Sequence, residues 1–150
     1  MTEILFYHLQ SQKPENVLPT LLEKSLERGW RVVVQGGSEE RIDALDAHLW
    51  TYRDDGFLPH GTWREPEAAE QPVLLTVNAG NANAATVRFL IDGAAVPAEA
   101  ESYQRLVLLF DGDDDDAVAA ARKQWTEAKA KGFDATYWQP DDSGRWVKKA

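Results

Sequence analysis

The chain has 150 residues, of which 16 are Lys or Arg and 25 are Asp or Glu, so its formal net charge is −9. That balance argues against a protein that grips duplex DNA over its whole surface, because phosphate contacts need clustered basic side chains. The absence of Cys excludes disulfides, a thiol nucleophile and a Cys-ligated zinc site.

A hydrophobic content of 43% with six Trp is typical of a packed globular chain, and the length predicts one domain over residues 1–150. No apolar run approaches the ~18 residues of a membrane helix, and the first ten residues lack the basic start of a signal peptide. We therefore expect a cytoplasmic protein with no membrane contact.

Short apolar runs alternate with segments of helical periodicity along the chain, and this alternation predicts an α/β fold. The elements expected in the first half are a strand at 4–9, a helix from Pro14 to Gly29, a strand at 31–34, and a helix that is capped by Ser38 and ends near Trp50. Residues 51–72 are rich in Gly and Pro and are predicted to form a long irregular connection.

The elements expected in the second half are strands at 73–77, 87–91, 106–110 and 133–138, a turn at 78–84, and a long helix from Asp113–Asp116 to about Lys131. Residues 145–147 either pair back as a hairpin or form a loose tail. Because the strands are almost wholly apolar and helices lie between them, we predict three layers, with a mostly parallel central sheet and helices on both faces.

Two segments resemble ligand sites without matching their patterns. Asp111–Asp116 has the carboxylates of a calcium loop, but Asp116 and Arg122 stand where such a loop needs Gly and Glu. We expect these Asp side chains to cap the following helix. Gly36-Gly37-Ser38 lies where α/β folds bind phosphate, but it matches no phosphate-loop pattern and precedes two Glu, so it is predicted to be a tight turn.

The polar residues form no catalytic constellation. None of the three His has metal-ligand spacing, a structural role is favoured for His60, and the serines lack a nucleophile-elbow pattern. No metal, no cofactor and no catalytic residue is therefore predicted.

The last long helix carries the most informative pattern. Val118, Arg122, Trp125 and Lys129 follow steps of four, three and four residues and share one helical face. A guanidinium beside an indole, with an ammonium one turn on, can hold a carboxylate and an aromatic ring together. Residues 117–150 carry seven basic and four acidic residues, which suits an acidic peptide. The alternative is that Trp125 belongs to the core and the basic side chains are ordinary solvated charges.

Trp50, Tyr52, Phe57 and Leu58 form a second cluster, at the end of a helix and in the loop after it. Such residues either close over a core or form a patch that faces a partner, since aromatic anchors dominate the energetics of protein interfaces.

Motifs along nearly the whole chain match one known pattern. The most specific are Leu45-Asp46-x-x-Leu49-Trp50-Thr51-Tyr52-Arg53-Asp54-x-x-Phe57-Leu58-Pro59-His60-Gly61 and the later Ala121-Arg122-x-x-Trp125, with Gly132-Phe133 after it. The supporting ones are Phe6-Tyr7-x-Leu9, Gly29-x-Arg31-Val32-x-Val34, Pro72-Val73-Leu74-Leu75 and Leu90-Ile91. Through these motifs the chain resembles the chi subunit family of bacterial DNA polymerase III.

The resemblance implies an α/β fold, no enzymatic activity of its own, and a place in the clamp-loader assembly. Chi proteins bind the C-terminal tail of single-stranded DNA-binding protein (SSB), an acidic stretch that ends in Phe and a free carboxylate. Carried over to this chain, Arg122 pairs with that carboxylate and Trp125, which replaces a Tyr of familiar members, helps to form the pocket for the Phe ring. Val118 stands where those members can carry Lys, and Lys129 or Lys123 is expected to compensate.

The resemblance also implies a second surface, which binds the small psi subunit or, in some bacteria, a helicase-like partner. Trp50 and Phe57 match the family's positions for this surface. DNA is then reached through SSB, and no direct DNA binding is expected. The expected function is a non-catalytic adaptor between SSB and the clamp loader in DNA replication.

Two other functions stay open on the residues alone. A small α/β nucleotide-binding domain or enzyme would use the carboxyl ends of the strands, near Gly36 or Asp111. A structural subunit would use the aromatic patch around Trp50 only for oligomerisation.

Overall fold

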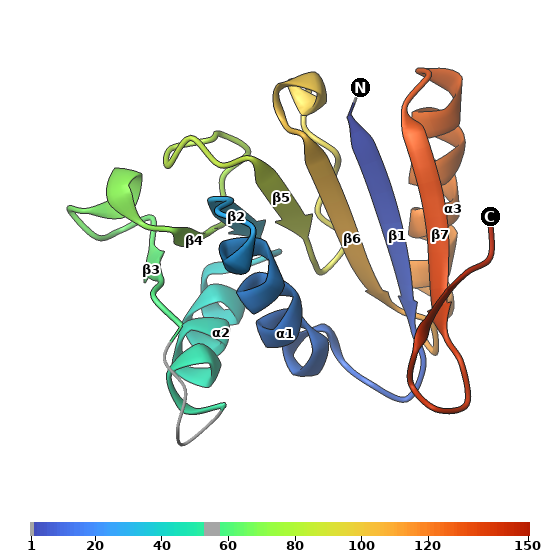
Figure 1. Ribbon diagram of the computed structural model, residues 1–150, viewed down its shortest axis with the longest axis horizontal. Helices are drawn as coiled ribbons and strands as arrows, with labels where there is room; N and C mark the ends of the chain where they lie inside the picture. Colours follow the sequence, from blue (N-terminus) through green and yellow to red (C-terminus); the bar gives the residue numbers. More distant parts are fainter. Residues whose placement is uncertain (1, 53–57) are drawn as a thin grey trace.

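The computed structural model describes residues 2–52 and 58–150 (Figure 1). Its strands are β1 (Glu3–Leu9), β2 (Val32–Gln35), β3 (Gly61–Thr62), β4 (Val73–Thr76), β5 (Val87–Leu90), β6 (Arg105–Asp111), β7 (Asp134–Pro140) and β8 (Trp146–Lys148). Its α-helices are α1 (Pro14–Glu27), α2 (Glu39–Thr51) and α3 (Asp115–Ala130), and short 3₁₀ turns occur at Ala68–Glu70 and Ala100–Ser102.

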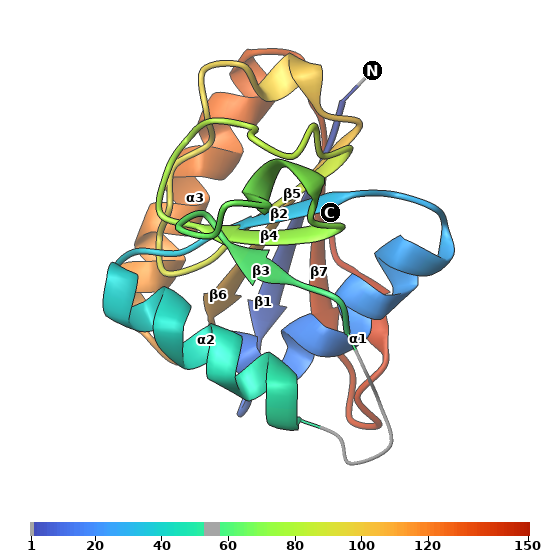
Figure 2. The ribbon, with the colours of Figure 1, turned by 90° about the vertical axis from the view of Figure 1, so that its left-hand side faces the viewer.

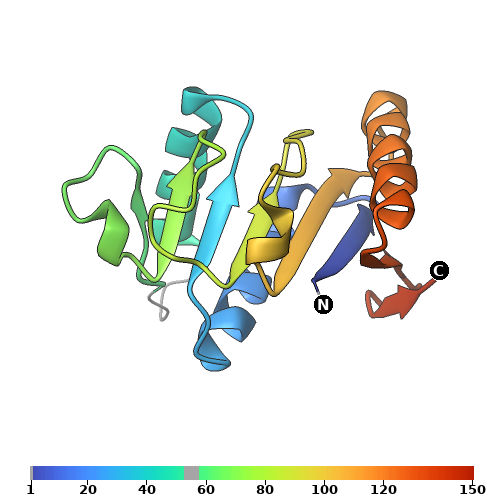
Figure 3. The same ribbon diagram turned by 90° about the horizontal axis from the view of Figure 1, so that it is seen from above.

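The strands form one eight-stranded sheet in the order β3-β4-β2-β5-β6-β1-β7-β8. Every neighbouring pair is parallel except β7 and β8, which are antiparallel. The predicted mostly parallel sheet is confirmed, and the two alternatives for 145–147 are resolved in favour of the hairpin. Figure 3 shows the twist of this sheet from its β4 side to its β7 side, where α3 lies.

Helices cover both faces of the sheet, as predicted. α1 and α2 pack Leu22 and Leu45 into a core cluster on one face, and α3 packs Ala121 and Ala128 into a second cluster on the other. Figure 2 shows α1 and α2 side by side and apart from α3. Within the described ranges, no helix combines the length and the apolar character needed to cross a membrane.

Local chemistry sets the helix starts where the sequence places them. The Ser38 side chain accepts a hydrogen bond from the backbone N–H of Arg41, which caps α2. The Asp114 carboxylate accepts hydrogen bonds from the N–H groups of Asp116 and Ala117, which caps α3. Both contacts satisfy backbone donors that have no partner inside the first helical turn. The capping prediction for the Asp-rich segment is therefore confirmed.

Three of the described connections between parallel strands contain no α-helix: residues 63–72 and two others that contact buried polar side chains. The two that contact buried polar side chains are residues 77–86, which include the predicted turn, and residues 91–104. Asn83, which is fully buried, donates from Nδ2 to the carbonyl oxygens of Val32 and Gln71. The Asn83 side chain thus ties the first connection to β2 and to the segment before β4.

The described part of the segment predicted to be irregular contains a strand. β3 pairs in parallel with β4 at the edge of the sheet, with Gly61 opposite Leu74. Two residues are too few to show the apolar pattern by which the longer strands are recognised, so β3 is not predictable from the sequence pattern. Residues 53–57 of this segment lie outside the described part of the chain.

Candidate functional site

The four residues singled out on the last helix lie on one face of α3, and we call them the α3 site: Val118, Arg122, Trp125 and Lys129. Arg122 and Lys129 are exposed, whereas Val118 and Trp125 are half-buried. The predicted sharing of a face follows from helical geometry alone, and the structure adds that the two cations of this face reach solvent.

Trp125 joins the surface of α3 to the core cluster beneath it. Its ring meets the ring of Phe6 edge-on, with centroids 5.4 Å apart, and that of Tyr137 with centroids 5.9 Å apart. The ammonium of Lys129 lies 5.0 Å from the centroid of the Trp125 ring, which is a cation–π distance. The indole thus packs against the core on one side and carries a cation on its outer part.

Two residues beside the α3 site were not predicted from the sequence. His8 Nδ1 lies 2.6 Å from the hydroxyl of Tyr137, and both side chains are close enough to Arg122 for its charge to act on them. Gly112 approaches His8 so closely that a Cβ there would overlap the imidazole. Only the parallel pairing of β7 with β1 brings Tyr137 and His8 next to α3.

Burial and the Arg122 guanidinium shift the pKa values of His8 and Tyr137. Burial lowers the pKa of His8; Asp113 raises that pKa, and Arg122 lowers it further. Burial raises the pKa of the Tyr137 hydroxyl, while Arg122 lowers it. The lowered pKa favours the neutral form of His8, so of these two side chains Arg122, and not His8, supplies the positive charge.

We expect stability to fall between about pH 7.5 and pH 5.5, partly because of His8. Its pKa in the folded chain is lower than in the unfolded chain, so the unfolded state takes up a proton first as the pH falls, and protonation favours unfolding. Urea denaturation of wild type and His8→Asn across this range measures the effect. The variant should lose less stability than wild type on acidification, and equal losses would contradict the assignment.

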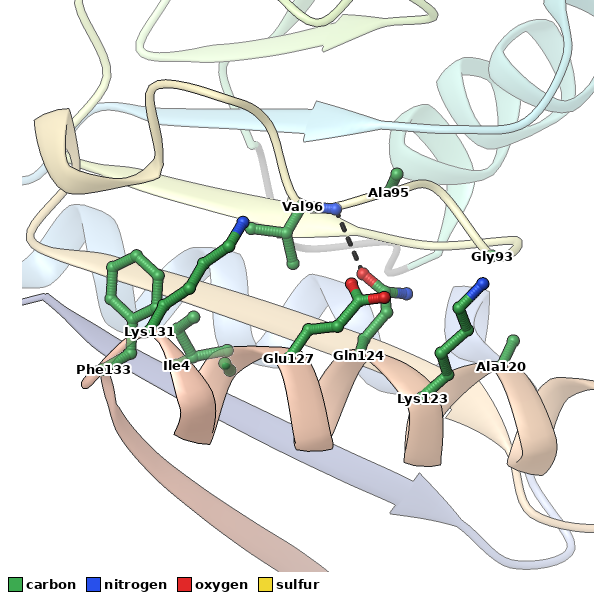
Figure 4. Close-up of a pocket in the computed structure, with 11 residues that line it drawn as sticks. Ile4, Gly93, Ala95, Val96, Ala120, Lys123, Gln124, Glu127, Lys131 and Phe133 are labelled. Atoms are coloured by element: carbon green, nitrogen blue, oxygen red, sulfur yellow. Dashed lines mark hydrogen bonds between the residues drawn. The ribbon is translucent and has the colours of Figure 1, made fainter.

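The pocket shown in Figure 4 lies on the other flank of α3, between the helix and the segment 93–96. It has a volume of about 310 Å³. Lys123 and Lys131 stand at its rim, and Gln124 Oε1 accepts a hydrogen bond from the backbone N–H of Val96 at 3.1 Å. Arg122 and Trp125 do not line it, so the helix presents basic side chains on two flanks.

The carboxyl ends of the central strands form a cavity of about 490 Å³ that bears on the nucleotide-binding alternative. Its lining holds five carboxylates and two cations, which disfavours a phosphate ligand. The backbone N–H of Gly37 donates to Asp92 Oδ2, and Asp92 also pairs with Arg41 at 3.1 Å. The Asp92 carboxylate thus already accepts the hydrogen bond from the Gly37 N–H that a phosphate would need. This agrees with the interpretation of Gly36-Gly37-Ser38 as a tight turn.

The predicted partner surface divides into an exposed and a buried part. Trp50 keeps 55% of its surface exposed, whereas Leu58 is buried. The buried imidazole of His60 lies 2.7 Å from the carbonyl oxygen of Leu58 and 2.9 Å from the carboxylate of Asp46, and its ring centroid lies 4.7 Å from that of Trp50. His60 therefore has the structural role that the sequence favours. Phe57 lies outside the described residues.

Among the described residues, no group of three or more His, Cys, Asp or Glu side chains is arranged to hold a metal ion. The arrangement on α3 is instead suited to bind an anion next to an apolar or aromatic group, through charge and stacking.

Comparison with known proteins gives one consistent result. The family described as DNA polymerase III chi subunit, HolC, matches residues 1–136. A Rickettsia prowazekii protein named probable DNA polymerase III subunit chi is 29% identical over 91 residues, which cover 61% of this chain and 55% of the relative. The DNA polymerase III subunit chi of Pseudomonas aeruginosa is 35% identical over 78 residues, which cover 50% of this chain and 54% of the relative. The chain thus spans about half the length of these curated relatives. Since the family match extends over most of its residues, the chain belongs to the DNA polymerase III chi subunit family.

Proposed function

We propose that this protein is a non-catalytic accessory subunit of the DNA polymerase III holoenzyme, which binds the C-terminal tail of SSB and links it to the clamp loader. In this proposal residues 1–150 act as one chi-like α/β domain in the replisome. Membership of the chi family supports the role in replication, and both relatives are named as chi subunits.

The observation that carries the proposal is an exposed guanidinium one helical turn from a half-exposed indole on α3. Arg122 presents a planar fork that pairs with the terminal carboxylate of the tail. Trp125 offers an apolar wall to the terminal Phe ring, and Lys129, stacked on the indole, attracts the acidic residues before it. Lys123 lies on the other flank of the helix and adds to the same positive field.

The exposed indole of Trp50 supports a second partner surface on α2. A large aromatic side chain in this position is typical of a protein interface anchor. We assign this surface to the psi subunit, or to another clamp-loader or helicase-like partner, together with Phe57. Helices α2 and α3 cover opposite faces of the sheet, so in this proposal both partners are able to bind at once.

Titration with a synthetic SSB-tail peptide tests the proposal. We expect binding on the order of micromolar affinity, because one exposed contact of this kind is weak by itself. The affinity should fall as salt rises, since the tail is acidic and its receptor basic. A peptide that lacks the terminal Phe should bind much more weakly. Equal binding of both peptides would contradict the proposed recognition of the chain end.

A further inference from the structure

A second basic and aromatic surface lies on the opposite face of the sheet from α3. It is a groove between α1 and the C-terminal hairpin of β7 and β8, made of two adjoining hollows of about 180 and 200 Å³. Figure 1 shows α1 and the C-terminal segment on the near side of the sheet, with α3 behind it. Leu21, Lys24 and Trp146 line both hollows, so the indole of Trp146 lies between them.

Aromatic rings form the walls of the larger hollow. Tyr7 and Trp146 have ring centroids 4.6 Å apart. The guanidinium carbons of Arg28 and Arg105 lie 4.9 and 5.1 Å from the centroid of the Trp30 ring. Apolar strand residues form the floor. The hollow therefore combines a ring-sized apolar space with cations at its edge.

The charge of the groove is opposite in sign to that of the whole chain. Its lining contains Lys24, Arg28 and Arg105, and no Asp or Glu is among the described residues that line the two hollows. Arg105 pairs with the carboxylate of Glu3 at 3.0 Å. In a chain with 25 acidic residues, this local excess of positive charge favours a polyanion.

The smaller hollow adds hydrogen-bonding groups to this pattern. Gln10, Gln12 and Asn16 line it beside Lys24 and Trp146. Side-chain amides carry both donors and acceptors and can therefore pair with the polar edge of a nucleobase.

The wall that the hairpin supplies lies outside the region shared with the family. The family match ends at residue 136, whereas Trp146 follows it. Tail binding at the α3 site, on the other face, does not use this groove.

We propose that the groove between α1 and the C-terminal hairpin binds single-stranded nucleic acid, with two successive bases on either side of Trp146 and Lys24 at the phosphate between them. Aromatic side chains along a basic groove are the usual receptor for single strands, because every base can stack on an indole. Two ring-sized hollows that share one lysine fit two bases joined by one phosphate. A peptide with a single terminal ring would fill only one of them. This proposal departs from the expectation that DNA is reached only through SSB. The negative net charge argues only against contact over the whole surface, so it does not oppose a local site.

The test is the fluorescence anisotropy of a short labelled oligothymidylate, titrated with the full chain at about 50 mM salt. Wild type should bind, and each tenfold rise in salt should weaken binding by about a hundredfold if three phosphates are contacted. Trp146→Ala should weaken binding about fivefold or more, since stacking on one ring is lost. Trp146→Phe should restore most of it. Lys24→Glu, at an exposed position on α1, should weaken binding without affecting the fold, which thermal melting of each variant checks.

Arg122→Ala is the matched control, because it alters the α3 site on the other face and should leave oligonucleotide binding unchanged. The inference would be overturned if the wild-type chain did not bind the oligonucleotide at low salt. It would also be overturned if Trp146→Ala and Lys24→Glu both bound it with the affinity of the wild-type chain. Displacement of the oligonucleotide by an acidic peptide that ends in Phe would reassign the groove to a peptide. Equal affinity for a duplex or for free thymidine monophosphate would also contradict recognition of a single strand.

Discussion

Arg122→Ala should weaken binding of the SSB-tail peptide by about 1.5–3 kcal/mol, or roughly 10- to 150-fold. The guanidinium is exposed and one turn from Trp125, where it can form two parallel hydrogen bonds to a chain-terminal carboxylate. Removing it leaves that carboxylate without its charged partner, while the indole and Lys129 stay in place. Isothermal titration with the wild-type peptide measures the loss directly.

Three further variants sharpen this test. Arg64→Ala removes an exposed Arg that pairs with Asp43 at 2.9 Å, away from α3, and should bind the peptide as wild type does. Arg122→Lys keeps the charge but not the planar fork, and an intermediate loss is expected. Lys123→Ala tests the other flank of α3. If it lost more peptide affinity than Arg122→Ala, the peptide would bind in the pocket of Figure 4 instead. If Arg122→Ala bound the peptide with wild-type affinity, the proposed site would be wrong.

Arg88→Met should destabilise the fold by about 3–5 kcal/mol. Arg88 is fully buried in β5, and its guanidinium donates to the hydroxyl of Tyr103 at 2.9 Å and to Gln35 Oε1 at 2.6 Å. It also donates to the carbonyl oxygens of Gly80 and Asn78, which fixes the 77–86 connection. Methionine fills similar space but leaves four acceptors without this donor, the Tyr103 hydroxyl in a buried position and the other three in partly buried ones. Thermal melting should show a decrease of about 10 °C or more.

The comparison variant for Arg88 is Arg31→Met. Arg31 is exposed; its hydrogen bond to the carbonyl oxygen of Ala69 is exposed to water and the one to Asn83 is partly buried. Because the side chain is not desolvated as Arg88 is, about 1 kcal/mol or less should be lost. Replacing a buried charge by an apolar side chain is neutral in some proteins when its partners are replaced as well. Here the partners stay, and stability equal to wild type in Arg88→Met would show that water or rearrangement satisfies them.

The α3 site and the groove can be tested separately because they lie on opposite faces of the sheet. Arg122→Ala is expected to affect only the peptide, and Trp146→Ala only the oligonucleotide. Loss of both ligands in either variant, with normal melting, would indicate one shared site and contradict this separation.

Much of the fold is local in origin and was therefore predictable. Apolar runs gave the longer strands within a few residues, and the cap residues Ser38 and Asp114 marked where α2 and α3 begin. The spacing of Val118, Arg122, Trp125 and Lys129 placed them on one face, because helical periodicity depends only on the residues of that helix. The sequence by itself therefore determined the α/β class and the composition of the α3 site.

Tertiary structure decided which distant residues surround these elements. Tyr137 reaches Trp125 and His8 because β7 pairs with β1, across about 130 residues of chain. Arg88 sits in an apolar run, and only the strand order brings it to Tyr103 and Gln35. Trp146 forms a groove only because the hairpin folds toward α1. Such contacts depend on which strands are neighbours in the sheet. The periodicity of a single segment contains no information about its neighbours, so the sequence pattern could not predict these contacts.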